Sequence, residues 1–417
     1  MPEAPLRDTA FAGPTLSDFP EARERGSSVI HVTPMETSSY LGGVLGAPVL
    51  LKCESLQRTG SYKIRGAYNR LSRLTDEEKA RGVVAASAGN HAQGVAFAAR
   101  ELGIKATIFM PLGVALPKLQ ATKDYGAEVI LRGHTVSEPL RAAAEFARTT
   151  GAVLIPPFDH FDVVAGQGTL GLEILDQRPD VETVIVPIGG GGLISGVASA
   201  IKQRAALDGR TVRIIGVQAA NAAPYPVSLA AGAPTEISIT PTIADGIAVA
   251  RPGDLNFESV TQFVDEVVTV TDDDTAQALL MLLERAKLVV EPAGAVGVAA
   301  ILSGKVEATG TTVVILSGGN IDPLMMERVI SHGLAASERY LKLRIPLPDR
   351  PGQLARTASI VAEANANVVE VLHTRHGSGL QISQVELELH IETRGPEHAE
   401  DVLARLRDEG FEPRIDF

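Results

Sequence analysis

The chain has 417 residues, of which 45% are hydrophobic and 21% are charged, and its net charge is −12. This length predicts two or three domains, and this balance is typical of a globular protein rather than a disordered one. The negative charge and the lack of a lysine- or arginine-rich block argue against nucleic acid or an anionic membrane as a partner.

Cys53 is the single cysteine, so neither an intrachain disulfide nor a cysteine-rich metal cluster can form. The first fifteen residues contain no apolar run typical of a signal peptide, and no apolar stretch reaches membrane-spanning length. We therefore expect a cytoplasmic protein.

From about residue 48 to residue 330, short apolar runs alternate with glycine-bearing loops and alanine-rich helical stretches. The clearest predicted strands are residues 83–86, 106–110, 129–131, 183–187, 213–217 and 311–316. This alternation predicts an α/β fold of two lobes with a cleft between them, in which mostly parallel sheets are covered by helices on both faces.

The stretch LKCESLQRTGSYKIRGAYNRL, residues 51–71, begins like a buried strand and ends like an amphipathic helix. Lys63 follows the small-residue turn Thr59-Gly60-Ser61 and stands at the start of that helix, where the helix dipole disfavours a cation. Such a position suits a nucleophilic amine. A surface lysine that simply follows a loop would account for the same letters.

Three further strand-to-helix turns carry polar or glycine-rich motifs. GGGGL, residues 189–193, would let backbone N–H groups converge on an anion such as a phosphate, although a tight structural turn is the alternative. SAGNHAQG, residues 87–94, offers Asn90 and His91, whose ordinary roles are a helix cap and a packed side chain. SGGN, residues 317–320, offers Ser317 as a cap or as a partner of a ligand nitrogen.

The pattern changes near residue 340. Strands are predicted at residues 341–347, 368–372, 382–391 and 411–417, and helices at residues 351–364 and 396–409. The order β-α-β-β-α-β is that of a small ferredoxin-like domain, and we expect the hinge before it at residues 332–339.

Six motifs, in this order, closely resemble those of the threonine dehydratases, which are pyridoxal-phosphate enzymes of the tryptophan-synthase-β type. They are SYKIRGA, SAGNHAQG, GGGGLISG, ADGIAV, EPAGA and SGGN, and the resemblance covers about residues 30–335. The tail, with DRPGQL at residues 349–354, resembles an ACT regulatory domain. The expected domains are therefore a two-lobed catalytic domain at residues 1–335 and an ACT domain at residues 340–417.

The resemblance implies a role for each motif. Lys63 would carry pyridoxal phosphate covalently and act as the catalytic base, Asn90 would bond the ring hydroxyl, and Ser317 would bond the pyridine nitrogen. The remaining implied cofactor contacts are Gly189, Gly190, Gly191, Gly192 and Leu193 at the phosphate and Gly246 beside the flat ring. The implied substrate contacts are Ser87, Ala88, Gly89 and His91.

Two departures from related families narrow the implied activity. Ala88 stands where serine racemases carry a serine that works as the acid/base on the opposite face. Gln218 stands where the racemases' divalent-metal site would show a glutamate, so we predict no metal. Both features favour a dehydratase.

The implied reaction converts L-threonine to 2-oxobutanoate and ammonia, and L-serine to pyruvate. A small amino-acid effector would act through the ACT domain of a homodimer or homotetramer. The alternatives left open are a serine racemase or a replacement enzyme with the same cofactor, a dinucleotide-dependent oxidoreductase, and a catalytically silent amino-acid sensor. The products formed from L-threonine would separate them.

Overall fold

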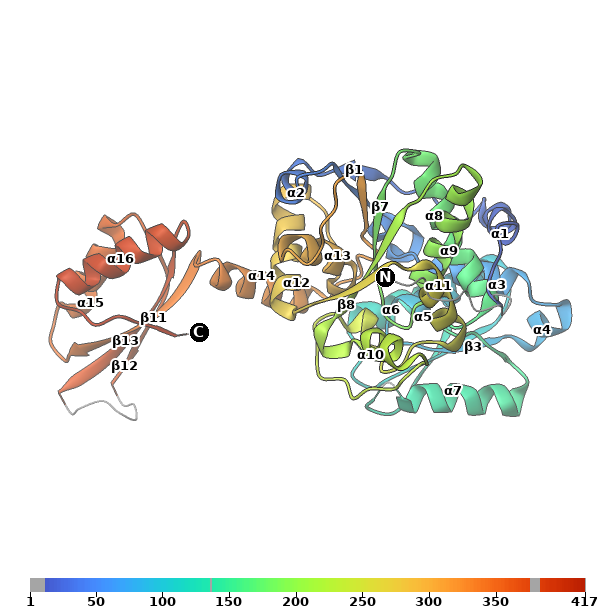
Figure 1. The fold of residues 1–417 in the computed structure, drawn as a ribbon. Helices are drawn as coiled ribbons and strands as arrows, with labels where there is room; N and C mark the ends of the chain where they lie inside the picture. Colours follow the sequence, from blue (N-terminus) through green and yellow to red (C-terminus); the bar gives the residue numbers. More distant parts are fainter. Residues whose placement is uncertain (1–11, 136, 376–382, 417) are drawn as a thin grey trace. The chain divides into compact units, whose positions relative to one another are not determined.

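The computed structural model describes residues 12–135, 137–375 and 383–416, and the chain divides into two compact units at Pro323/Leu324 (Figure 1). The first unit contains two sheets and the second contains one.

The larger sheet of the first unit has six strands in the order β1-β2-β10-β7-β8-β9. The strands are β1 (Met35–Thr37), β2 (Val49–Lys52), β10 (Thr312–Ile315), β7 (Thr183–Pro187), β8 (Arg213–Ala219) and β9 (Glu266–Val270). Only the pairing of β1 with β2 is antiparallel. Strands β2, β7 and β10 are buried along their whole length, which is why they read as continuous apolar runs.

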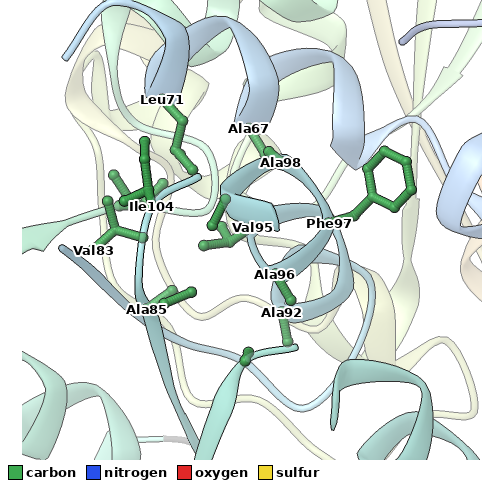
Figure 2. Packing of buried hydrophobic residues seen from close by; sticks show 14 of the residues in the cluster. Ala67, Leu71, Val83, Ala85, Ala92, Val95, Ala96, Phe97, Ala98 and Ile104 are labelled. Atoms are coloured by element: carbon green, nitrogen blue, oxygen red, sulfur yellow. The ribbon is translucent and has the colours of Figure 1, made fainter. Parts of the chain in front are cut away.

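The smaller sheet of the first unit is fully parallel, with the order β5-β4-β3-β6. Its strands are β5 (Glu128–Leu131), β4 (Ala106–Met110), β3 (Val83–Ala86) and β6 (Val153–Leu154). Helices α3 (Lys63–Ser72) and α5 (Asn90–Glu101) contribute Ala67, Leu71, Val95 and Ala98 to a buried cluster that also contains Val83 of β3 (Figure 2). This packing holds α3, which begins at Lys63, against the sheet that contains β3, the strand before Asn90.

Helix α8 (Phe161–Gln177) packs very closely on α3. Gly166 makes this possible, since a Cβ there would lie 2.5 Å from the carbonyl oxygen of Arg65. Helix α9 (Gly192–Leu207) follows the glycine-rich loop and packs on α8. The other helices of this unit are α1 (Asp18–Gly26), α2 (Ser39–Leu45), α4 (Asp76–Arg81), α6 (Leu116–Asp124), α7 (Ser137–Thr150), α10 (Pro224–Ala231), α11 (Asp254–Phe263), α12 (Asp272–Met281) and α13 (Pro292–Leu302).

The second unit is a four-stranded antiparallel sheet with two helices, preceded by α14 (Pro323–Ala336). Its order along the chain is β11 (Tyr340–Pro348), α15 (Gln353–Glu363), β12 (Asn367–Thr374), β13 (Gln384–Glu392), α16 (Pro396–Asp408) and β14 (Arg414–Asp416). The spatial order β12-β13-β11-β14 places the first and third strands in the centre. The predicted β-α-β-β-α-β domain is confirmed.

The predicted elements agree with the structure to within a few residues, with three differences. The last strand, expected at residues 411–417, is Arg414–Asp416, and Phe417 lies outside the described residues. Residues 332–336, expected in a hinge, are the end of α14, so three residues separate this helix from β11. The strand expected from residue 382 begins at Gln384, and Ile382 itself lies outside the described residues. In the described part of the chain, no helix combines the length and the apolar character needed to cross a membrane.

Candidate active site

The motifs singled out in the sequence follow the carboxyl ends of strands in both sheets of the first unit. Residues 87–90 follow β3, Gly189 follows β7 and Ser317 follows β10. Ligands of open α/β sheets bind beyond this edge of the strands. A hydrogen bond from Asn320 to Asn90 joins the loops after β10 and β3. The glycine loop lies against Phe158, whose neighbour Pro157 accepts a hydrogen bond from Lys63.

Lys63 is the first residue of α3, as predicted, and two backbone contacts hold the turn before it. The backbone N–H of Tyr62 donates to the carbonyl of Ser317 over 3.1 Å, and Ser61 pairs with Gly318 in a short antiparallel bridge. The Nζ of Lys63 donates to the carbonyl of Pro157 over 3.1 Å. The backbone before Lys63 is therefore held against the SGGN loop, and Lys63 itself is half-buried, with its amine at the Pro157 carbonyl.

Helix α5 also supports this turn. A Cβ at Gly94 would lie 3.3 Å from the carbonyl carbon of Lys63, so the glycine lets α5 pack directly on the backbone that carries the amine. The last glycine of SAGNHAQG thus has a packing role.

The glycine-rich loop between β7 and α9 is closely surrounded by side chains. Gly191 has a φ of +104°, a conformation that favours glycine, and a Cβ there would collide with the hydroxyl of Tyr225. A Cβ at Gly190 would collide with the ring of Phe158, which also approaches Gly192. Residues with side chains would not fit here.

The carbonyl of Gly190 accepts three hydrogen bonds, which fix the orientation of the loop. They come from the Tyr225 hydroxyl over 3.2 Å, the Asn256 Nδ2 over 3.1 Å and the Gly253 N–H over 3.1 Å. Helix α9, of 16 residues, starts at Gly192. The free N–H groups at the start of such a helix, together with bare glycine backbone, make an anion-binding loop.

Asn90 begins α5 and its side-chain amide is bonded at both ends. Its Nδ2 donates to Oε1 of Glu291 over 2.6 Å, and its Oδ1 accepts from Nδ2 of Asn320 over 2.8 Å. The two partners come from EPAGA and SGGN, so three of the six motifs meet at one amide group.

The predicted substrate loop, residues 87–91, is half-buried except for His91. The N–H of Gly89 donates to the Ser87 hydroxyl over 3.2 Å. The His91 ring is buried, and its Nε2 donates to the carbonyl of Ile155 over 2.9 Å. Burial, with the positive charge of Lys63, lowers the pKa of His91 to about 3, so this ring is neutral and its Nε2 is occupied.

Residues 27–318 match the family model described as pyridoxal-phosphate dependent enzyme, and residues 343–411 match the model of the ACT domain. The chain belongs to the pyridoxal-phosphate dependent enzymes. The predicted cofactor, pyridoxal phosphate, and the predicted ACT domain are thereby confirmed.

Two relatives match nearly the whole chain. The L-threonine ammonia-lyase of Thermotoga maritima is 48% identical over 402 residues, which are 96% of this chain and 99% of the relative. The L-threonine ammonia-lyase of Geobacter sulfurreducens is 46% identical over 392 residues, 94% of this chain and 96% of the relative. The predicted resemblance to threonine dehydratases is confirmed.

Solved structures show the same fold. The maize serine racemase is 36% identical with a TM-score of 0.72, over 78% of this chain and 99% of that chain. The processed form of threonine deaminase isoform 2 from Solanum lycopersicum is 36% identical with a TM-score of 0.70, over 77% of this chain and 94% of that chain. The family fold therefore accommodates both lyases and racemases.

The residues present fit pyridoxal phosphate. The loop at residues 189–192 leaves no room for side chains and presents the start of a helix, as a phosphate requires. A primary amine, an amide and a hydroxyl lie in the neighbouring loops, at Lys63, Asn90 and Ser317. These are the groups that would hold the aldehyde carbon, the ring oxygen and the ring nitrogen.

Glu291 is the site residue to which the sequence analysis assigned no role, although EPAGA was one of its motifs. Its side chain is only 4% exposed. Burial raises the pKa of Glu291 to about 7, and the nearby Asp245 carboxylate adds to this effect. Lys118, the amide of Asn90 and Lys63 act in the opposite direction. A titratable carboxyl therefore lies in direct contact with Asn90.

Gly246 lies in the short helix η4 (Asp245–Ile247), where a Cβ would come within 2.9 Å of the Ala293 side chain. A Cβ at Gly189 would in turn lie 3.1 Å from Cα of Ile247, so the two loops pack closely. The predicted close backbone approach at Gly246 is thus toward α13 in this structure, and its contact with the cofactor ring stays a prediction.

Gln218 is fully buried and has a packing role. Its Oε1 accepts from the backbone N–H of Tyr225 over 3.0 Å, and its Nε2 donates to the carbonyl of Ile188 over 3.4 Å. Gln218 thereby positions the tyrosine that holds the glycine loop. Across the described ranges, no group of three His, Cys, Asp or Glu residues is arranged to hold a metal ion.

A buried ion cluster supports α3 at Arg65, two residues beyond Lys63. Arg65 bonds Glu54 over 2.7 Å and Glu173 over 3.0 Å, and Glu173 bonds Lys52 over 2.6 Å. All four side chains are at most 6% exposed. The charges balance, so each one is paired, and removal of any partner would leave an uncompensated buried charge.

Proposed function

We propose that the protein is a threonine ammonia-lyase, which converts L-threonine to 2-oxobutanoate and ammonia and L-serine to pyruvate. The observation that carries this proposal is the Lys63 amine at the start of α3, with the Asn90 amide, the glycine loop and Ser317 in the adjoining loops. Relatives of matching length bear the same name.

Pyridoxal phosphate, when bound, supplies an electron sink for the bond from Cα to hydrogen. Lys63 would hold it covalently until the amino group of the substrate takes its place, and the freed Nζ would then act as the general base that takes the Cα proton. The N–H groups of residues 189–193 bind its phosphate, and the start of α5 at Ser87–Asn90 orients the substrate carboxylate.

Ser317 favours elimination over transamination, which other pyridoxal-phosphate enzymes carry out. Its hydroxyl is neutral, so it bonds the ring nitrogen without enforcing protonation as a carboxylate would. A weaker electron sink favours prompt loss of the β-hydroxyl group. Ser317 is only 3% exposed, so little water reaches this residue.

The main rival is a serine racemase, because a racemase is among the structures with this fold. Ala88 supports the lyase, because a racemase must return a proton to the substrate Cα from the face opposite to the lysine. The methyl group of Ala88 cannot supply this proton. Its position is half-buried in the loop that precedes Asn90. Gln218, engaged with Tyr225 and Ile188, supports a reaction without a divalent metal.

The proposal extends to regulation. A small amino acid, with isoleucine and valine as the first candidates, would bind between ACT domains of a cytoplasmic homodimer or homotetramer. The edge strand β12 supports pairing of two copies, because its Val369, Val371 and Leu372 are between 40% and 55% exposed. Residues 1–335 would form the catalytic domain and residues 340–417 the ACT domain.

Product analysis tests the proposal. Purified protein incubated with L-threonine should release 2-oxobutanoate and ammonia in equal amounts without added metal. Borohydride should fix the cofactor on Lys63, and Lys63→Ala should lower turnover by at least roughly 10²–10⁴-fold, since it removes the base as well as the anchor. Accumulation of D-serine from L-serine, or near-normal turnover of Lys63→Ala, would overturn it.

A further inference from the structure

We propose that Glu291 and Asn320 are positioning residues that fix the Asn90 amide with its NH₂ group, rather than its oxygen, available to the ring oxygen of pyridoxal phosphate. The inference rests on the proposed function, which places the cofactor at Lys63. It concerns residues to which neither the motifs nor the family match assigns a role.

An asparagine side chain has two faces of similar shape and opposite polarity. Its NH₂ group donates and its oxygen accepts, and the two can exchange by rotation about one bond. The ring oxygen of the cofactor, when ionised, only accepts. If Asn90 turned its oxygen toward the ring oxygen, two acceptors would face each other and repel. The orientation of the amide therefore decides whether Asn90 binds the ring oxygen.

The first anchor is the backbone carbonyl of Thr59, which can only accept. Nδ2 of Asn320 lies 2.7 Å from this oxygen, so Asn320 must turn its NH₂ group toward it. The same Nδ2 lies 2.8 Å from Oδ1 of Asn90, which must therefore be the accepting face. Gln93 offers a further acceptor to Asn320 at 3.4 Å.

The backbone at this anchor is held in a conformation unusual for its residues. Thr59 has a φ of +61°, which is rare for a β-branched residue, and Gly60 follows with a φ of +69°. A Cβ at Gly60 would collide with Oδ1 of Asn320, so the glycine makes room for this amide. The N–H of Gly319 donates to the carbonyl of Gly60 over 2.9 Å and ties the two loops together.

The second anchor is the carboxyl group of Glu291, which accepts from Nδ2 of Asn90 over 2.6 Å. This group is closely confined, because a Cβ at Gly318 would collide with Oε1 of Glu291. One of its oxygens accepts whether or not the carboxyl is protonated. The Thr59 carbonyl thus fixes the polarity of the two amides, and Glu291 provides the acceptor that their one consistent arrangement requires.

The NH₂ group of Asn90 is therefore a hydrogen-bond donor with a fixed orientation. One hydrogen of the Asn90 NH₂ group is used by Glu291, and the second stays available for the cofactor. The polarity is set from Thr59 through Asn320, and Glu291 accepts on the other side of the Asn90 amide, so the orientation is already fixed before a ligand binds.

The test reverses the polarity while it keeps the side-chain shapes. Asn320→Asp removes the donor to Asn90, and the double variant Asn320→Asp/Glu291→Gln offers an acceptor where the donor was and a donor where the acceptor was. Asn90 should then rotate and turn its oxygen toward the cofactor. Glu128→Gln is the matched control, since Glu128 pairs with Lys105 over 3.1 Å on the exposed side of β5.

The readouts are the absorbance bands of the bound cofactor, which report whether its ring oxygen carries a proton, and the dissociation constant of pyridoxal phosphate. In the double variant, the bands should shift toward the form with a protonated ring oxygen. The dissociation constant should rise roughly threefold to tenfold, as expected for the loss of one hydrogen bond. Glu291→Gln alone keeps an acceptor and should shift less, and Glu128→Gln should match the wild type.

Unchanged bands and an unchanged dissociation constant in the double variant would overturn the inference and leave the proposed function intact. A wild-type protein without cofactor on Lys63 would overturn both. If the double variant does not fold, Asn320→Ala removes the first anchor alone. A shift in its bands in the same direction would support the inference, and wild-type bands would overturn it.

Discussion

The ammonium group of Lys118 lies 3.2 Å from the carboxylate of Asp245, and this ion pair joins loops that belong to different sheets of the first unit. Lys118 is on α6, which follows β4, and Asp245 is on η4, between β8 and β9. A Cβ at Gly89 would lie 3.8 Å from the Lys118 nitrogen. The ammonium group therefore stands beside the loop that is proposed to hold the substrate carboxylate.

We predict that Lys118→Gln raises KM for L-threonine roughly 10–150-fold and changes kcat less, because a charge-assisted hydrogen bond to a bound carboxylate contributes roughly 1.5–3 kcal/mol. Asp245→Asn is the matched variant, since it releases Lys118 from its partner and should leave KM unchanged or lower it. Steady-state kinetics would decide. A raised KM in Asp245→Asn with a normal KM in Lys118→Gln would contradict the prediction.

The glycine loop provides a second prediction, with a control on the same helix. Gly191 has a φ of +104° and precedes α9, whereas Gly209 has a φ of +64° just beyond the end of α9 and has open space around it. Alanine at either position costs about 1–2 kcal/mol of left-handed backbone strain. At Gly191 the added methyl group also meets Tyr225, which adds about 1–3 kcal/mol of overpacking.

Gly191→Ala should therefore lower Tm more than Gly209→Ala and should weaken the binding of pyridoxal phosphate, which Gly209→Ala should not. Thermal unfolding and cofactor titration of both variants measure the two effects. Equal losses of Tm with wild-type cofactor affinity in both would show that the loop has no special role.

The raised pKa of Glu291 predicts a pH dependence of stability. In the unfolded chain this carboxyl has its ordinary pKa of 4.5, and burial together with Asp245 raises the native pKa to about 7, against the effects of Lys118, Asn90 and Lys63. Between these values the native state binds more protons than the unfolded state. The free energy of unfolding therefore falls as pH rises through this window, by about 3 kcal/mol in total.

Glu291→Gln removes this dependence. Relative to the wild type, the variant should gain stability as pH rises from about 4.5 to about 7, with a constant difference above that range. Thermal unfolding of both proteins across this range measures the difference. A difference in Tm that is the same at all pH values would mean that Glu291 remains ionised when buried.

Local motifs explain why much of the site was predictable from the sequence. Lys63, the glycine loop and Ser317 each follow a short apolar strand, and the geometry of a strand-to-helix turn depends on nearby residues. The pair Asn90 and Glu291 was not predictable in this way, because 201 residues separate them and only the packing of two sheets brings them together.

The same distinction holds for His91 and for the fold. The position of His91 in SAGNHAQG did not reveal that its ring bonds the carbonyl of Ile155. This contact depends on how α5 is rotated relative to β6.

The alternation of strands and helices predicted the parallel sheets. The order β1-β2-β10-β7-β8-β9 depends on contacts between distant segments, and alternation alone carries no information about them.

A further prediction concerns the second unit, whose edge strand β12 exposes apolar side chains. If two copies pair through this edge, Val371→Lys should weaken pairing, because a charge on an edge strand opposes strand addition. Leu207→Lys, at a residue that is 70% exposed at the end of α9, is the matched control and should not alter the oligomer. Light scattering of both variants checks this. A full-size oligomer in Val371→Lys would show that β12 is not the contact.

Truncation before Tyr340 removes β11 and everything after it, while both sheets of the first unit remain intact. The shortened enzyme should still deaminate L-threonine, since the proposed cofactor and substrate contacts all lie between Lys63 and Asn320. It should lose its response to isoleucine or valine. An effector coupled by the usual 1–3 kcal/mol changes substrate affinity roughly 5–150-fold in the full chain, and the substrate changes effector affinity by the same factor. Activity measured against effector concentration for both proteins gives this factor. If the truncated enzyme responds like the full chain, the effector binds to the first unit, because no part of the ACT sheet would remain to bind it.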